Sequence, residues 1–95
     1  MLKYKGVYSM DVKKEFIVRE IAGDYILVPY GQTSLDFNGI VTMNEIGRFI
    51  WENIEKAEDE DELLDFILDE YEVERDVAKA DLDEFLKILR DAEII

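Results

Sequence analysis

Hydrophobic and polar residues alternate with a period of two in the first half of the chain and follow a helical period in the second half. The change falls between Ile40 and Ile54, in the run IVTMNEIGRFIWENI. Ile40 to Met43 alternate as in a short strand, whose successive side chains point to opposite faces. From Ile46 the apolar residues recur at i, i+3, i+4 and i+8, which predicts one face of an amphipathic helix. A strand that runs directly into a helix is therefore the centre of the predicted fold.

Two residues at this junction are candidates for the helix N-cap. In Thr42-x-x-Glu45, the Thr hydroxyl would accept from the N–H of Glu45 while the Glu45 carboxylate accepts from the N–H of Thr42. Asn44 is the alternative, because its side-chain oxygen is also a preferred cap. The sequence leaves both assignments open.

A β-hairpin is predicted before the junction. Phe16–Ile21 alternates and is rich in β-branched residues, and Tyr25–Val28 repeats the pattern. Pro29 ends the second strand because it lacks a donor for the ladder. Gly23 lies in the tight turn between the strands, where it is free to take a positive φ.

A further strand is predicted at Thr33–Phe37, which also alternates. Asn38-Gly39 is a strong signal for a two-residue hairpin turn. If that turn forms, we expect Leu35 and Phe37 to pair back against Val41 and Met43.

Two more amphipathic helices are predicted after the junction. The second begins near Asp59, where Asp59-x-x-Glu62 resembles a capping box, and ends near Tyr71 or Glu72. The third ends near Arg90, a cation placed where the helix dipole favours it. The apolar faces of these helices consist of Leu63, Leu64, Ile67, Leu68 and Tyr71, and of Ala78, Leu82, Phe85, Leu89 and Ala92.

The order of these elements predicts an α+β domain, with a small antiparallel sheet of three or four strands followed by three helices. The short connection between the last two helices is typical of a winged helix-turn-helix arrangement. A length of 95 residues allows one domain with one core. We assign residues 15–95 to this domain and residues 1–14 to an N-terminal arm, and we expect Ile94 and Ile95 to pack on the body.

Composition narrows the possible chemistry. The chain has no Cys and no His, which excludes disulfides and Cys nucleophiles and removes the commonest general base and metal ligand. No apolar run is long enough to cross a bilayer. We therefore expect a cytoplasmic protein that is not an enzyme, with no metal, no cofactor and no membrane partner.

The net charge of −13 is concentrated in the helical half, where residues 51–95 carry eighteen acidic and five basic residues. Such a surface repels phosphate backbones and favours solubility or a basic partner. The third helix carries more acids than bases, so it lacks the cationic surface that duplex binding requires. We expect no nucleic-acid partner; a winged-helix DNA-binding or regulatory protein is the alternative, and a gel shift at low salt would detect it.

Four segments occur in the order and spacing of a known family. They are FIVREIAGDYILVP (16–29), GIVTMNEIGRFIW (39–51), DELLDFILDEYEV (61–73) and DLDEFLKILRDAEII (81–95). From about Phe16 to Ile95 they resemble the PqqD-like family, named for coenzyme PQQ synthesis protein D. These proteins are the archetype of the element that recognises precursors of ribosomally synthesised and post-translationally modified peptides (RiPPs).

The resemblance implies a non-catalytic peptide-binding protein, a peptide chaperone in natural-product biosynthesis such as PQQ biosynthesis. Such domains hold the leader of a precursor peptide and present its core to a modifying enzyme, often a radical SAM maturase. The leader typically adds as a strand beside the strand before the first helix, in a cleft whose other wall is the third helix. Here those elements correspond to Gly39–Met43 and to the helix around Asp81–Arg90.

Mapping these elements onto the sequence gives a set of expected site residues. The expected peptide-binding residues are Ile40, Val41, Thr42, Met43, Asp83, Leu86, Lys87 and Arg90. We expect backbone groups of Val41 and Thr42 to bond the leader, since strand addition uses an unpaired ladder edge. Leu86 would contact an apolar anchor, Lys87 and Arg90 would meet acids of the leader, and Asp83 would hold a Lys.

Alternative interpretations stay open for several of these residues. Leu86 lies just off the main apolar stripe, so packing in the core is as reasonable as contact with a ligand. Lys87 and Arg90 would otherwise pair with nearby acids at the surface, where such pairs contribute little. Trp51 is a candidate interface anchor, although we expect it to cap the sheet as part of the core. An exposed strand edge also permits a homodimer.

Overall fold

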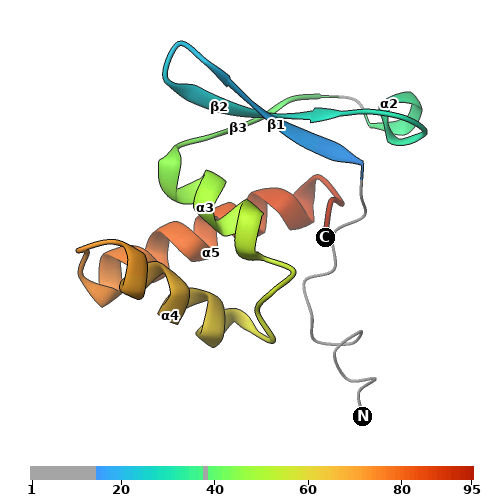
Figure 1. Cartoon of the computed structure of the whole chain (residues 1–95). Helices are drawn as coiled ribbons and strands as arrows, with labels where there is room; N and C mark the ends of the chain where they lie inside the picture. The colour runs from blue at the N-terminus through green and yellow to red at the C-terminus, as the bar shows by residue number, and fades with distance from the viewer. Residues whose placement is uncertain (1–14, 38) are drawn as a thin grey trace.

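The computed structural model describes residues 15–37 and 39–95, and it places a small sheet over a layer of helices (Figure 1). The antiparallel sheet has the order β1-β2-β3, with bounds β1 Phe16–Ile21, β2 Asp24–Pro29 and β3 Val41–Met43. The helices are α2 Thr33–Asp36, α3 Glu45–Asn53, α4 Glu60–Glu70 and α5 Arg75–Asp91. The predicted α+β class is confirmed, with three strands, and α4 and α5 form the helix-turn-helix part. The predicted N-terminal arm, residues 1–14, lies outside the described residues.

The predicted hairpin of β1 and β2 turns at Ala22 and Gly23. Ile21 pairs with Asp24, which leaves two residues in the turn, with φ of 53° at Ala22 and 88° at Gly23. Positive φ at both central residues is what a type I′ turn requires, and this turn matches the twist of the strands. Gly23 meets that requirement without strain, whereas Ala22 holds a Cβ in the same region.

The prediction of a strand at Thr33–Phe37 is wrong, because this segment begins with the one-turn helix α2. The Glu15 carboxylate accepts from the N–H and from the hydroxyl of Thr33, each at 3.0 Å. This contact satisfies a donor at the start of the helix through a residue eighteen positions away. Leu35 is 75% exposed instead of paired in the sheet, and Phe37 packs its ring edge-on against Phe16. Asn38 of the predicted turn lies outside the described residues.

Side-chain caps fix the starts of α3 and α4. Asn44 caps α3, its Oδ1 accepting from the N–H of Gly47 at 2.8 Å, so the alternative cap at Thr42 is excluded. Asp59 caps α4 as predicted, accepting from the N–H of Glu62 at 2.9 Å. The Glu62 carboxylate accepts from the N–H of Glu58 instead of that of Asp59, which shifts the reciprocal bond of a capping box by one residue.

The core lies between the inner face of the sheet and the three long helices. Its fully enclosed side chains are Leu27, Ile50, Ile54, Leu63, Leu64, Ile67, Leu82, Leu86, Leu89 and Ile94. The predicted faces of α4 and α5 are confirmed, with Leu86 added to that of α5. Trp51 is half-buried against this core with its ring edge-on to Phe16, as expected for a residue that caps the sheet.

The backbone conformation of Glu93, just after α5, suggests a stabilising substitution. Glu93 follows the helix with a φ of 61°, and the N–H of Ile94 donates to the carbonyl of Leu89 while that of Glu93 donates to Arg90. These bonds form a Schellman motif with Glu93 at the left-handed C′ position, where Gly is normally found. We expect Glu93→Gly to raise the free energy of unfolding by about 0.5–1 kcal/mol, because a side chain in this region costs about 1 kcal/mol.

Urea denaturation would measure this change. Glu93→Gln is the matched control, because it removes the acid from the helix C-terminus but keeps a side chain at positive φ. Equal stability of the Gly and Gln variants would contradict the role assigned to the backbone conformation.

Candidate functional site: a groove between β3 and α5

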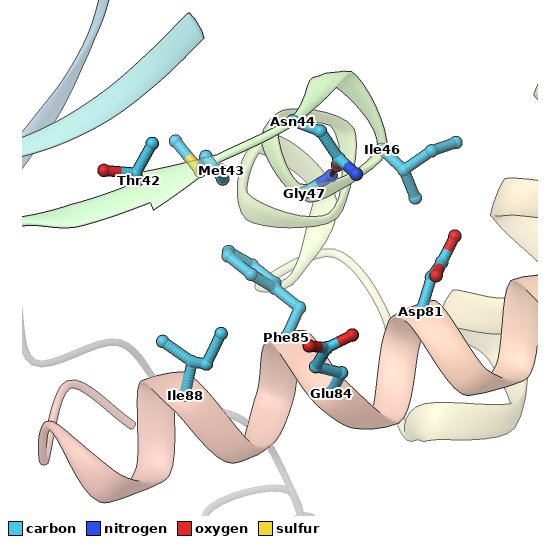
Figure 2. A pocket seen from close by; sticks show the side chains of 9 residues that line it. All are labelled: Thr42, Met43, Asn44, Ile46, Gly47, Asp81, Glu84, Phe85 and Ile88. Carbon is cyan, nitrogen blue, oxygen red and sulfur yellow. Dashed lines mark hydrogen bonds between the residues drawn. The ribbon is translucent and has the colours of Figure 1, made fainter.

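The third strand has one open edge. β3 pairs with β2 along one side, and within the described chain no strand pairs with its other side. Such an edge presents unpaired N–H and C=O groups and is a template for a further strand. Across a hollow from Thr42 of β3 lie Phe85 and Ile88 of α5 (Figure 2).

The pairing of β1 with β2 shows which way the backbone groups of β2 point. The N–H of Tyr30 donates to the carbonyl of Glu15 at 2.8 Å, in register with the ladder of the hairpin. The N–H and C=O of successive residues point alternately to the two sides of an antiparallel strand. Counting back from Tyr30, the backbone groups of Leu27 therefore point to β3.

The same alternation identifies the residue that faces the open edge. Val41 is opposite Leu27 and Met43 is opposite Tyr25, so the backbone groups of Val41 and Met43 turn inward to β2. Thr42 lies between them, and its N–H and C=O turn outward. A guest strand would therefore bond to Thr42, whereas the backbone of Val41 is already used.

The groove beside this edge begins as a hollow of about 180 Å³ at the junction of β3 and α3. Its lining residues are Thr42, Met43, Asn44, Ile46, Gly47, Asp81, Glu84, Phe85 and Ile88. Figure 2 shows Phe85 and Ile88 pointing from α5 toward β3, with Asp81 farther along the helix toward Ile46. The hollow thus has an apolar floor and carboxylates at one end.

A second, more open hollow of about 500 Å³ continues the groove past the start of β3. Phe37, Gly39, Ile40 and Val41 line it on the sheet side, and Ile88, Asp91 and Ala92 line it on α5. Ile88 belongs to both hollows and is 41% exposed, so it is the apolar midpoint of the groove.

Gly47 allows the elements of this groove to meet closely. A Cβ at Gly47 would lie 2.8 Å from Cβ of Met43 and 3.4 Å from the ring of Phe85. The Cβ of Met43 is fixed to the β3 backbone and has no freedom to move away. The absence of a side chain at Gly47 therefore sets the distance of α3 from β3 and from α5.

This contact predicts that Gly47→Ala destabilises the fold even though Ala is the better helix former. Over-packing costs about 1–3 kcal/mol, against a gain of about 1 kcal/mol in helix propensity. We expect a net loss of about 1–2 kcal/mol in the free energy of unfolding. Urea denaturation measures it, with Glu52→Ala on the exposed side of α3 as the control; a Gly47→Ala protein as stable as the parent would contradict the close approach.

The basic residues of α5 are all engaged in ion pairs. Arg75 pairs with Asp65 of α4 and Arg90 with Glu60 of α4. Two further pairs lie within α5, Lys79 with Asp83 and Lys87 with Asp91. Hydrogen bonds to these acids raise the pKa of both lysines above its usual value, so both stay charged.

The strand residues expected at the site all lie beside the groove. Ile40 is 72% exposed over the second hollow, and Thr42 is exposed at the open edge. The side chains of Val41 and Met43 point into the core and are only 6% and 5% exposed, and each also lines one of the two hollows. The structure thus brings these four residues together, with Thr42 supplying the free backbone groups.

The helix residues expected at the site lie on other faces of α5. Leu86 is completely buried in the core, which is the alternative that the sequence left open. Asp83, Lys87 and Arg90 form the surface ion pairs described above and line neither hollow. The structure therefore does not bring these four residues to the groove.

The groove face of α5 consists instead of residues that the sequence analysis did not select. They are Asp81, Glu84, Phe85, Ile88, Asp91 and Ala92. Their spacing of three and four residues describes one helical stripe next to the core stripe. Ile88 was the available signal, because it is a large apolar residue outside the predicted core face.

Comparison with known proteins agrees with this architecture. The family model described as coenzyme PQQ synthesis protein D (PqqD) matches residues 17–95. The chain belongs to the PqqD family. The PqqD match begins within β1 and includes every later element up to the end of the chain.

One solved structure resembles this PqqD-family chain over nearly its whole length. It is described as TbiB1 in complex with the TbiA(beta) leader peptide, and it is 25% identical in sequence with a TM-score of 0.65. The alignment covers 90% of this chain and 93% of the TbiB1 chain. Among the curated proteins, nothing matches this chain. None of the helices in residues 15–37 and 39–95 is long and apolar enough to span a bilayer.

Proposed function

We propose that this protein binds the leader of a ribosomally synthesised precursor peptide as an added strand and presents the peptide to a modifying enzyme. The observation that carries the proposal is the open backbone edge at Thr42, which faces a groove walled by α5. Strand addition needs such an edge for affinity and adjacent pockets for specificity. Membership of the PqqD family and the leader peptide in the similar TbiB1 structure support the same role.

A binding role suits the chemistry of the groove better than catalysis. The groove combines apolar side chains, carboxylates and free backbone groups, and the chain has no His or Cys to form a nucleophile and base pair. Duplex DNA is a poor partner, because carboxylates of α5 line this wall and would face the phosphates. The modifying enzyme, a radical SAM maturase in this proposal, would act on the part of the peptide that extends beyond the groove.

Titration of ¹⁵N-labelled protein with the synthetic leader of a candidate precursor peptide tests this function. We expect saturable chemical-shift changes confined to Gly39–Met43 and to the groove face of α5. A peptide of the same composition in scrambled order is the control. Shifts confined to α4 or to the outer face of the sheet would contradict binding at the open edge.

Self-association is a second use of the same edge and must be separated from peptide binding. Sedimentation velocity of the free protein and of its peptide complex would give both masses. A complex of one protein with one peptide agrees with the proposal. A protein dimer that persists at saturating peptide argues against it.

A further inference from the structure

The distribution of charge along the groove specifies the kind of peptide that it accepts, if the proposed function holds. Asp81 and Glu84 line the first hollow, and Asp91 lines the second. Among residues 15–37 and 39–95, no Lys or Arg lines either hollow. The groove is therefore acidic on its helix wall and apolar at its midpoint, Ile88.

The ion pairs of α5 show which carboxylates of the groove keep an uncompensated negative charge. Each of its four basic residues is paired with an acid, and within the described residues Asp81 and Glu84 have no ion-pair partner. Asp91 is held by Lys87 at 2.7 Å, so the charge at that end of the groove is partly neutralised. The uncompensated negative charge is thus at the end of the groove near the start of α3.

We infer that the groove selects peptides in which a Lys or Arg is separated by one residue from a large apolar residue. Glu84 and Ile88 are four residues apart on α5, a rise of about 6 Å along the axis. An extended strand rises about 3.3 Å per residue and places every second side chain on the same face. Two side chains of a guest strand on the face toward α5 therefore match this spacing, one cationic at Glu84 and Asp81 and one apolar at Ile88.

The carboxylates of Asp81 and Glu84 favour a cationic peptide side chain in two ways. A Lys or Arg of the peptide donates a charge-assisted hydrogen bond to these carboxylates, and the net charge of −13 steers its approach. An acidic peptide would meet unpaired carboxylates in a groove with a partly apolar lining, where repulsion is weakly screened.

Selection from a display library of random peptides about 12 residues long, enough to extend past both hollows as a strand, tests the inference whatever the natural ligand is. We expect enriched sequences to carry Lys or Arg two positions from Leu, Ile, Val, Phe or Met. The enrichment for basic residues should disappear with the double variant Asp81→Asn/Glu84→Gln. It should persist with Asp69→Asn/Glu70→Gln, which removes the same charge from the end of α4, away from the groove.

Fluorescence anisotropy of the best-enriched peptide then gives the size of the effect. Replacing its basic residue by Gln should weaken binding about tenfold, as for a hydrogen bond to a charged group. The same replacement should have little effect on binding to Asp81→Asn/Glu84→Gln.

The outcomes separate this inference from the proposed function. If enriched peptides need the N–H of Thr42 but show no basic preference, the charge inference is wrong and peptide binding stands. If selection returns no peptide whose binding depends on Thr42, both are wrong.

Discussion

Replacing Leu86 by Ala should lower the free energy of unfolding by about 2–5 kcal/mol and leave the groove intact, because Leu86 is a core residue. Its exposure is 0%, and it packs among the buried side chains of the core. A cavity left there would remove contacts on all sides of the missing side chain. Peptide affinity of the folded fraction should change by less than about threefold, since the side chain does not reach the groove.

Ile88→Ala is the matched control, two residues along the same helix. Ile88 is 41% exposed and lines both hollows, so its loss should cost under about 1 kcal/mol of stability. Peptide binding should weaken about tenfold, because the apolar side chain of the bound peptide loses its contact with Ile88. Urea denaturation and anisotropy titration together measure both effects. A strong loss of binding in Leu86→Ala with stability unchanged would show that the ligand, not the core, contacts Leu86.

Thr42→Pro should weaken peptide binding at least about tenfold, because a guest carbonyl left without a donor costs about 1–3 kcal/mol. The N–H of Thr42 faces the open edge, so its removal breaks no bond between β2 and β3. Proline is tolerated on an edge strand when its nitrogen faces solvent. The free protein should therefore remain folded.

Two variants serve as controls for Thr42→Pro. Thr42→Val keeps the N–H and the branched shape, and its affinity should stay within about twofold of the parent. Val41→Pro removes an N–H that points to β2, so it should lower the stability of the free protein far more than Thr42→Pro does. Full peptide affinity in Thr42→Pro would contradict strand addition at this edge.

The elements that the sequence predicted correctly depend on local chemistry. The tight turn with positive φ at Gly23, the cap at Asp59 and the buried stripes of α4 and α5 each follow from residues within one or two turns of chain. The prediction of a strand at Thr33–Phe37 was wrong, because the contact that stabilises helix α2 comes from Glu15, eighteen positions away. Alternation in so short a segment does not distinguish a strand from a helical turn.

The candidate site was predictable on its strand side and not on its helix side. Periodicity identified β3 and the helix that follows it, but α5 has three faces and the sequence does not say which one meets β3. A helix turns by about 100° per residue, so an error of two residues, from Leu86 to Ile88, moves a side chain from the core to the groove. Only the crossing of α5 beneath β3, set in part by the missing side chain of Gly47, decides between them.

The sequence by itself determined the hairpin, the strand-to-helix junction, the three long helices with most of their core faces, and the acidic character of the helical half, because these follow from local periodicity and composition. The tertiary structure decided which backbone groups are left without a partner and which carboxylates line the groove. Pairing register and helix rotation are properties of packing between segments distant in the chain, and residue spacing does not encode them.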